Sequence, residues 1–189
     1  MNAASIAAAR RARLTEIMTE DGVDLLIIYG NAWQNDYLRY ATDFGILEGE
    51  GIAIVRGDGH TTLLLDHPLE ADRAEVETAG IEIVHAETIL AEVESFIARA
   101  GNSRIGLGPM RLIPQRLAVR AKEIGAADRT AMMDRLLMKK LDCELAAMRA
   151  AASMADEGYA VFKNAARAGR AWLSAAALRS RTRRRTRST

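Results

Sequence analysis

The stretch Asp24-Leu25-Leu26-Ile27-Ile28-Tyr29 decides the fold of this chain. A short, almost continuous apolar run bounded by turn residues is typical of a central strand that is covered on both faces. Gly22 precedes the run and ends a helix that we predict over residues 4–20, and Gly30-Asn31 turns the chain after it. We therefore expect a buried strand in the middle of a sheet, with helices packed on both sides.

Strand and helix patterns continue downstream of this stretch. Arg56-Gly57-Asp58-Gly59-His60 separates two apolar runs, and its Asp-Gly pair is typical of a hairpin turn. Residues 33–41 suit a short helix or an irregular loop. Further strands are predicted over 51–55, 61–65, 81–84, 104–108 and 127–133, and further helices over 69–79, 89–100 and 114–124. The pattern predicts an α/β fold, a mixed β-sheet with one antiparallel hairpin, flanked by helices and followed by one long helix.

The long helix is predicted over residues 141–166, where apolar side chains recur at alternating steps of four and three. These steps return side chains to one face of a helix. At a rise of ~1.5 Å per residue the helix is ~39 Å long, and an apolar face of that length needs a partner. We call this face the interface seam, and it consists of Leu141, Leu145, Met148, Ala152, Ala155, Tyr159 and Phe162. We expect the seam to be buried in a homodimer or by the helix folding back.

Composition places the chain among globular proteins, with 49% hydrophobic and 27% charged residues in 189. No apolar run reaches the ~20 residues of a membrane span, and no apolar segment of a secretory signal follows the N-terminal arginines. Cys143 is the one cysteine, which excludes an internal disulfide and fits a reducing compartment. We expect a cytoplasmic protein without a membrane partner.

Charge is divided unevenly along the chain. Residues 1–157 hold 17 basic and 25 acidic side chains, whereas residues 158–189 hold nine basic ones and no acid. The basic tail, residues 170–189, is expected to be disordered because it repels itself and has little to bury. An alternative function is therefore a small interaction or nucleic-acid-binding protein acting through this tail. The tail lacks interleaved aromatics for base stacking, so nucleic acid is the less favoured partner.

Residue patterns that carry catalytic chemistry are not found. Gly106-Leu107-Gly108 follows a predicted strand, but Arg111 stands where a dinucleotide fingerprint needs its third glycine. His60 and His67 flank one predicted strand, which separates them by ~23 Å at ~3.3 Å per residue, too far apart to share a metal ion. We therefore predict no catalytic residue, no metal ligand and no cofactor in this chain.

Three segments carry a resemblance to a known family. Arg10 to Met18, followed by Gly22 to Ile27, resembles the opening of the creatinase / Xaa-Pro aminopeptidase / prolidase family. Residues 35–44 resemble an internal signature ending in Arg-Tyr-Leu-Thr-Gly-Phe, with Ala41 and Asp43 as departures. Residues 135–152 are similar to the family's Lys-x-x-x-Glu-Leu-x-x-Met-Arg-x-Ala entry into its catalytic domain.

The resemblance implies three parts. Residues 1–131 are an N-terminal α/β domain, residues 132–169 a linker and the first long helix of a pita-bread catalytic domain, and residues 170–189 the basic tail. In full-length relatives the catalytic domain usually binds two divalent metal ions through side chains beyond the long helix. After Gly169 the family expects a Thr-Glu pair where this chain has Arg170-Ala171-Trp172-Leu173. We expect truncation or a reading-frame change there.

The resemblance also implies a function. The N-terminal domain of this family is non-catalytic, covers one side of an active site and mediates subunit contacts, so we expect this chain to be inactive alone. Trp33, Tyr37, Tyr40 and Phe44 are the candidates for lying near a substrate, and packing into the core is the favoured alternative for Tyr40 and Phe44. A further alternative is a regulatory subunit that associates with a full-length relative.

Overall fold

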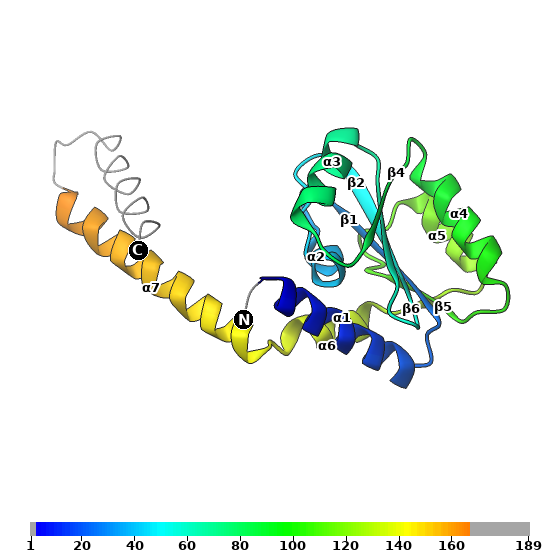
Figure 1. Cartoon of the computed structure of the whole chain (residues 1–189), viewed down its shortest axis with the longest axis horizontal. Coiled ribbons are helices and arrows are strands. Elements are labelled where there is room, and N and C mark those ends of the chain that lie inside the picture. The colour runs from blue at the N-terminus through cyan, green and yellow to red at the C-terminus, as the bar shows by residue number, and fades with distance from the viewer. Residues whose placement is uncertain (1–2, 167–189) are drawn as a thin grey trace. The chain divides into compact units, whose positions relative to one another are not determined.

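The computed structural model describes residues 3–166 of the chain (Figure 1). The chain divides into two compact units at the junction between Lys140 and Leu141. The first unit holds a six-stranded sheet in the order β4-β3-β2-β1-β5-β6. Its strands are β1 (Leu25–Asn31), β2 (Glu50–Arg56), β3 (Thr61–Leu65), β4 (Glu82–His85), β5 (Ile105–Gly108) and β6 (Ala127–Asp128). Its helices are α1 (Ala3–Glu20), α2 (Asp36–Thr42), α3 (Pro68–Glu77), α4 (Ile89–Ala100), α5 (Gln115–Glu123) and α6 (Thr130–Met138).

The sheet is mixed, as the sequence predicts. Strand β2 is antiparallel to both of its neighbours, β1 and β3. The pairs β1–β5, β3–β4 and β5–β6 are parallel. The hairpin predicted around Asp58 joins β2 to β3, where Gly59 has a φ of +88° and its N–H donates to the carbonyl of Arg56. The expected fold class is thus confirmed.

Strand β1 sends alternate side chains into two separate cores, because successive residues of a strand point to opposite faces. Leu26 and Ile28 belong to one buried cluster. Leu25, Ile27 and Tyr29 belong to the other. The continuous apolar run that we expected to be covered on both faces is therefore buried on both, and β1 lies inside the sheet between β2 and β5.

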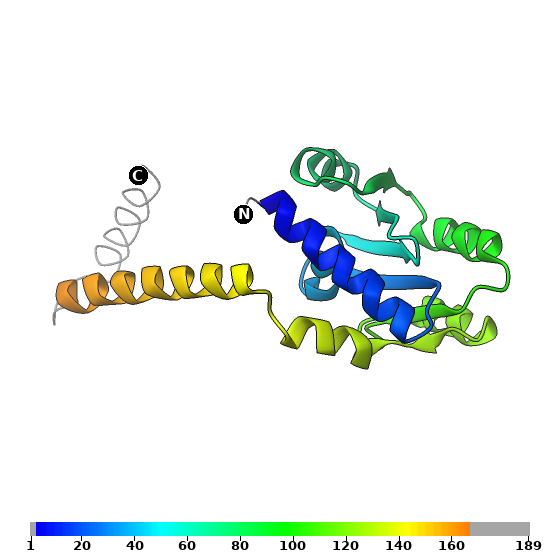
Figure 2. The same cartoon turned by 60° about the horizontal axis from the view of Figure 1, so that its bottom comes forward.

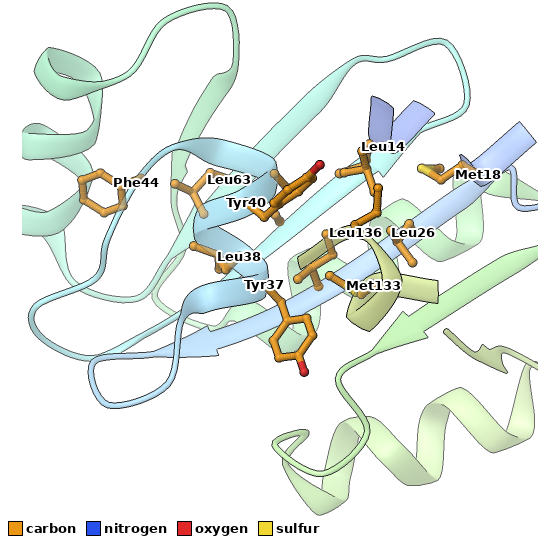
Figure 3. Close-up of a cluster of buried hydrophobic side chains, with 14 of the residues drawn as sticks. Leu14, Met18, Leu26, Tyr37, Leu38, Tyr40, Phe44, Leu63, Met133 and Leu136 are labelled. Carbon is orange, nitrogen blue, oxygen red and sulfur yellow. The ribbon is translucent and has the colours of Figure 1, made fainter. Parts of the chain in front are cut away.

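Helices cover both faces of the sheet (Figure 2). The cluster that contains Leu26 also takes buried side chains from α1, α2, α3 and α6, and Figure 3 shows part of it. In the cluster that contains Leu25, the buried side chains contributed by helices come from α4 and α5. In α1, Leu14 and Met18 are fully buried and Ile17 is partly buried, so one apolar face of this helix packs into the cluster.

The strand predicted over residues 127–133 is wrong beyond its first two residues. Ala127 and Asp128 pair with β5, but α6 begins at Thr130. The carboxylate of Asp128 accepts hydrogen bonds from the backbone N–H and the hydroxyl of Thr130, at 2.8 and 2.6 Å. Short polar side chains satisfy free N–H groups in this way at the start of a helix.

Helix α6 extends the first unit beyond the boundary at residue 131 that we expected from the sequence. Met132, Met133 and Leu136 are buried in the same cluster as Leu26, and these positions share one helical face. The unit therefore continues to Lys140. The residues that we expected to serve as a linker are mostly helix.

The second unit begins with α7 (Asp142–Ala165), which matches the predicted long helix to within one residue at each end. The carboxylate of Glu144 accepts a hydrogen bond from the backbone N–H of Leu141 at 2.7 Å. On the seam, Met148 is 55% exposed and Tyr159 is 62% exposed. Within residues 3–166, no helix is both long enough and apolar enough to cross a membrane.

Candidate functional site

One edge of the sheet gathers the ends of several strands. Asn31 at the end of β1 is paired with Glu50 at the start of β2, and Gly51 is paired with Leu65 at the end of β3. Leu65 in turn is paired with His85, the last residue of β4. We call this the carboxyl edge. Open α/β sheets bind their ligands beyond the carboxyl ends of the strands, so this edge is the candidate site.

The loop after β1 carries Trp33 at the carboxyl edge. The side-chain oxygen of Asn31 accepts hydrogen bonds from the backbone N–H groups of Trp33 and Gln34, both at 3.0 Å. The side-chain amide of Asn35 donates to the carbonyls of Asn31 and Ile46, at 3.0 and 3.1 Å. The backbone of the loop is thus fixed, while the indole of Trp33 is 94% exposed.

A second loop, residues 43–49, is fixed beside the first. Arg73 of α3 donates to the carbonyl of Gly45 at 2.6 Å and stacks over the ring of Phe44 at 4.2 Å from its centre. Glu70 accepts from the backbone N–H of Leu47 at 3.2 Å and pairs with Arg73 at 2.5 Å. Despite these anchors, the side chain of Leu47 is 73% exposed.

The two loops are joined, because the N–H of Ala32 donates to the carbonyl of Gly49 at 3.2 Å. Leu69, which precedes Glu70 in the first turn of α3, is 68% exposed. We call Trp33, Leu47 and Leu69 the edge surface. Hydrogen bonds hold the segments that carry these three side chains together, and exposed apolar side chains grouped on one surface are candidates for binding a partner.

A polar network underlies the carboxyl edge. The hydroxyl of Tyr29 donates to one oxygen of Glu50 at 2.8 Å, and Arg116 of α5 donates to the other at 3.1 Å. Asp66 accepts from the backbone N–H of Glu50 at 2.9 Å. Burial raises the pKa of the Tyr29 phenol, and the Glu50 carboxylate raises it further. Both oxygens of Glu50 are engaged, so the network fixes the strand ends and does not present a free base.

Gly49 allows the second loop to approach this network closely. Its φ is +76°, and a Cβ at this position would lie 2.2 Å from a carboxylate oxygen of Asp66. Only glycine adopts this backbone conformation without strain and leaves room for the carboxylate. The position of the loop at the carboxyl edge therefore depends on the absence of a side chain at residue 49.

The four aromatic candidates lie in different surroundings. Phe44 is fully buried and Tyr40 is buried, with the guanidinium of Arg10 at 5.9 Å from its ring centre. Tyr37 is buried at the margin of the same cluster, and its hydroxyl points away from the other labelled side chains (Figure 3). Among the four, only Trp33 is exposed at the carboxyl edge. Their proximity to a substrate stays a prediction.

The hydroxyl of Tyr37 makes two hydrogen bonds outside the apolar cluster. It donates to Asp134 of α6 at 2.5 Å and accepts from the guanidinium of Arg111. Burial raises the pKa of Tyr37, the bond to Asp134 raises it further, and Arg111 opposes both. This arrangement links three segments of the first unit.

His60 and His67 lie apart, as the sequence predicts. His60 is 3.2 Å from Glu82 at the start of β4, and His67 is 3.8 Å from Glu48 at the carboxyl edge. These two histidines flank β3 at its opposite ends. In the part of the chain that the structure describes, no three His, Cys, Asp or Glu side chains are grouped so that they could hold a metal ion. The arginine-rich tail, residues 170–189, lies outside the described residues.

Sequence reasoning missed Leu47, Leu69, Glu50 and Arg116. Ile46 and Leu47 are adjacent apolar residues, and the local sequence does not indicate that Ile46 is buried while Leu47 is exposed. Glu50 and Arg116 lie 66 positions apart, and strand order alone brings them together. The glycines at 45, 49 and 51 are the signal that could have drawn attention to this loop.

Comparison with known proteins bears on this site. No curated protein matches the sequence. Among solved structures, X-Pro aminopeptidase from Thermotoga maritima has a TM-score of 0.75 at 18% identity, with 93% of this chain and 49% of that chain covered. Xaa-Pro dipeptidase from Bacillus anthracis has a TM-score of 0.69 at 19% identity, with 95% and 49% covered. Aminopeptidase P from Streptococcus thermophilus has a TM-score of 0.56 at 17% identity, with 69% and 97% covered.

These likenesses show a shared fold, and this chain spans about half the length of the first two proteins, 49% of each. The family model of the Creatinase/Prolidase N-terminal domain matches residues 10–139. The matched span coincides closely with the first compact unit, which ends at Lys140. It also includes every residue of the carboxyl edge. The chain therefore belongs to the creatinase/prolidase N-terminal domain family.

Proposed function

We propose that the first unit is a non-catalytic domain that covers the active site of a prolidase-like catalytic domain and contributes to subunit contacts. The observation that carries this proposal is the edge surface. Trp33 is 94% exposed on a loop whose backbone is fixed by Asn31 and Asn35. An exposed aromatic side chain on fixed backbone loses little conformational entropy when it contacts a partner.

The chemistry at the carboxyl edge supports a covering role. Glu50 is held by Tyr29 and Arg116, and Glu70 is held by Arg73 and the backbone of Leu47. These carboxylates stabilise loop positions and leave apolar side chains at the surface. Apolar contact with a substrate or a neighbouring domain excludes water, which strengthens electrostatic interactions in the covered site.

The proposed partner is a catalytic domain of the same family, in the same protein or in a neighbouring subunit. The family resemblance implies that the two-metal ligand set of full-length relatives lies beyond the long helix, and the proposal adopts this expectation. On this basis, residues 1–189 cleave no Xaa-Pro bond, and a homodimer or a complex with a full-length relative is the proposed assembly. The single cysteine suits a cytoplasmic location.

Activity of the purified chain provides the first test. The chain is incubated with a series of Xaa-Pro dipeptides and with creatine, each in the presence of Mn²⁺, Co²⁺ or Zn²⁺. We expect product formation no faster than in samples without protein. Metal-dependent turnover that co-elutes with the chain through two columns would show that the domain is catalytic and would overturn this part of the proposal.

Complementation tests the covering role directly. A Bacillus anthracis Xaa-Pro dipeptidase lacking its N-terminal half is mixed with the present chain, and kcat/KM is measured for an Xaa-Pro dipeptide. We expect the wild-type chain to raise kcat/KM and the double variant Trp33→Ala, Leu47→Ala to lose most of the gain. The matched control is Val76→Ala, because Val76 is 86% exposed on α3 outside the edge surface. Equal gains from all three proteins would refute a role for the edge surface.

A further inference from the structure

Helix α7 carries a charged flank along one side of the interface seam. The flank consists of the residues that directly follow Leu141, Met148, Ala155 and Phe162, which are Asp142, Arg149, Asp156 and Lys163. All four are exposed, they recur every seven residues, and their charges alternate in sign. Among residues 3–166 none of the four makes an ion pair. We call this set the charged flank.

The opposite flank of the seam has a different character. It consists of the residues that directly precede Leu145, Ala152, Tyr159 and Ala166, which are Glu144, Ala151, Gly158 and Ala165. Three of these four are small and uncharged. We call this set the small flank. The side chains of the seam are smallest at its centre, where Ala152 and Ala155 lie and are both exposed. A second helix can therefore approach closely at this point.

The charged flank and the small flank determine whether a partner helix binds parallel or antiparallel to α7. When two helices pack along a seven-residue apolar repeat, the residues beside the seam set the orientation. A parallel second copy brings the charged flank of one helix against the small flank of the other, which leaves most of the charges without a partner. An antiparallel second copy brings charged flank to charged flank and small flank to small flank.

The antiparallel arrangement also matches the signs of the charges. If Ala152 of one copy packs beside Ala155 of the second copy, Met148 packs beside Tyr159. In the same register, Asp142 is nearest to Lys163 of the second copy, and Arg149 is nearest to its Asp156. Symmetry repeats both pairs, so the charged flank forms four attractive pairs while the exposed side chains of Met148 and Tyr159 become buried.

We propose that α7 binds a second copy of this chain as an antiparallel helix pair along the interface seam. The partner is a second copy of this chain, because the charged flank is complementary to itself. When a second copy of the flank runs in the opposite direction, each charged residue faces a residue of opposite charge. This inference concerns the second unit and does not depend on the covering role proposed for the edge surface.

Sedimentation equilibrium of the full chain at low ionic strength tests the association. We expect a dimer, and we expect Arg149→Glu with Lys163→Glu to weaken it at least tenfold because the charged flank becomes entirely acidic. Helicity measured by circular dichroism checks that the variant still folds. The matched variant Asp142→Lys with Asp156→Lys makes the flank entirely basic. An equimolar mixture of the two variants is expected to form a heterodimer of wild-type affinity.

The direction of pairing is measured through Cys143, the one cysteine in the chain. Nitroxide labels on Cys143 in the proposed antiparallel register are separated by about 32 Å along the helix axis at ~1.5 Å per residue. A parallel pair in register places the labels at the same height, about 20 Å apart across two helices. We expect a distance beyond 30 Å by pulsed electron paramagnetic resonance. The short distance, a monomeric wild-type chain, or a dimer insensitive to the acidic variant would each overturn the proposal.

Discussion

The phenolic oxygen of Tyr37 lies 2.5 Å from a carboxylate oxygen of Asp134, although 97 positions separate the two residues in the sequence. Arg111 donates to the same phenolic oxygen. These hydrogen bonds join α2, the loop that follows β5, and α6. Because α6 is the last helix before the unit boundary at Lys140, Tyr37 attaches the end of the first unit to the elements around β1.

Replacing Tyr37 with Phe tests this attachment. The change removes a donor to Asp134 and an acceptor for Arg111, and hydrogen bonds to charged groups contribute about 1–3 kcal/mol. We expect the free energy of unfolding, measured by urea denaturation, to fall by that amount. Thr19→Val, which removes an exposed hydroxyl from α1, is the matched control and is expected to change stability by less than about 0.5 kcal/mol. Equal stability of the two variants would contradict the structural role.

Phe44 and Trp33 are expected to respond in opposite ways to truncation. Phe44 is fully buried beneath Arg73, whereas the indole of Trp33 is 94% exposed. Loss of a buried phenyl ring leaves a cavity, so Phe44→Ala should lower the free energy of unfolding by about 3–5 kcal/mol. Trp33→Ala should change it by less than about 0.5 kcal/mol. Thermal and urea unfolding of both variants measure the difference, and similar losses would show that Trp33 is packed in solution.

Asp24 provides a pH-dependent contribution at the start of β1. Its carboxylate accepts from the backbone N–H of Arg104 at 2.8 Å and from the guanidinium at 2.9 and 3.1 Å, which lowers its pKa from 3.8 to about 2. A pKa that is lower in the folded state stabilises the fold above the unfolded pKa. The contribution is therefore present above about pH 4 and is lost as the pH falls from about 4 to about 2.

The variant Asp24→Asn should lack this pH dependence. We expect the stability difference between wild type and variant to be constant above about pH 5 and to shrink in the window from about pH 4 to about pH 2. Urea denaturation between pH 2 and 7 measures it. In Arg104→Gln, the carboxyl resonance of Asp24 should titrate at higher pH than in wild type. An unchanged titration midpoint in Arg104→Gln would show that Arg104 is not the cause.

The unit boundary predicts where a protease cuts first. Helix α6 ends at Met138, Lys139 is extended, and both Lys139 and Lys140 are exposed. Exposed backbone between compact units is a preferred site of nicking. Within residues 3–166, limited trypsin digestion should cleave first after Lys139 or Lys140 and leave the first unit resistant. The double variant Lys139→Gln, Lys140→Gln should be digested by trypsin more slowly than the wild-type chain. A first cut inside residues 3–138, identified by mass spectrometry, would argue against this boundary.

Elements with a strong local pattern were predicted well from the sequence. Helix α7 was predicted to within one residue at each end because its seam repeats over the whole length. Residues 127–133 were assigned to a strand although most of them form α6, because the Met132-Met133 pair also suits a buried strand and the start of the helix depends on Asp128. Similarly, the residues around Phe44 favour core positions for Tyr40 and Phe44, which are buried, but do not decide between Trp33 and Tyr37.

The sequence by itself determined that a doubly covered strand forms at residues 24–29, that helices and strands alternate around it, and that a long helix with one apolar face follows. These properties are local, since they depend on the spacing of apolar residues within one element. Only the tertiary structure decided that Trp33, Leu47 and Leu69 share the carboxyl edge while Tyr37 is buried. That distinction depends on strand order and register, which bring residues together across long separations and which no single segment encodes.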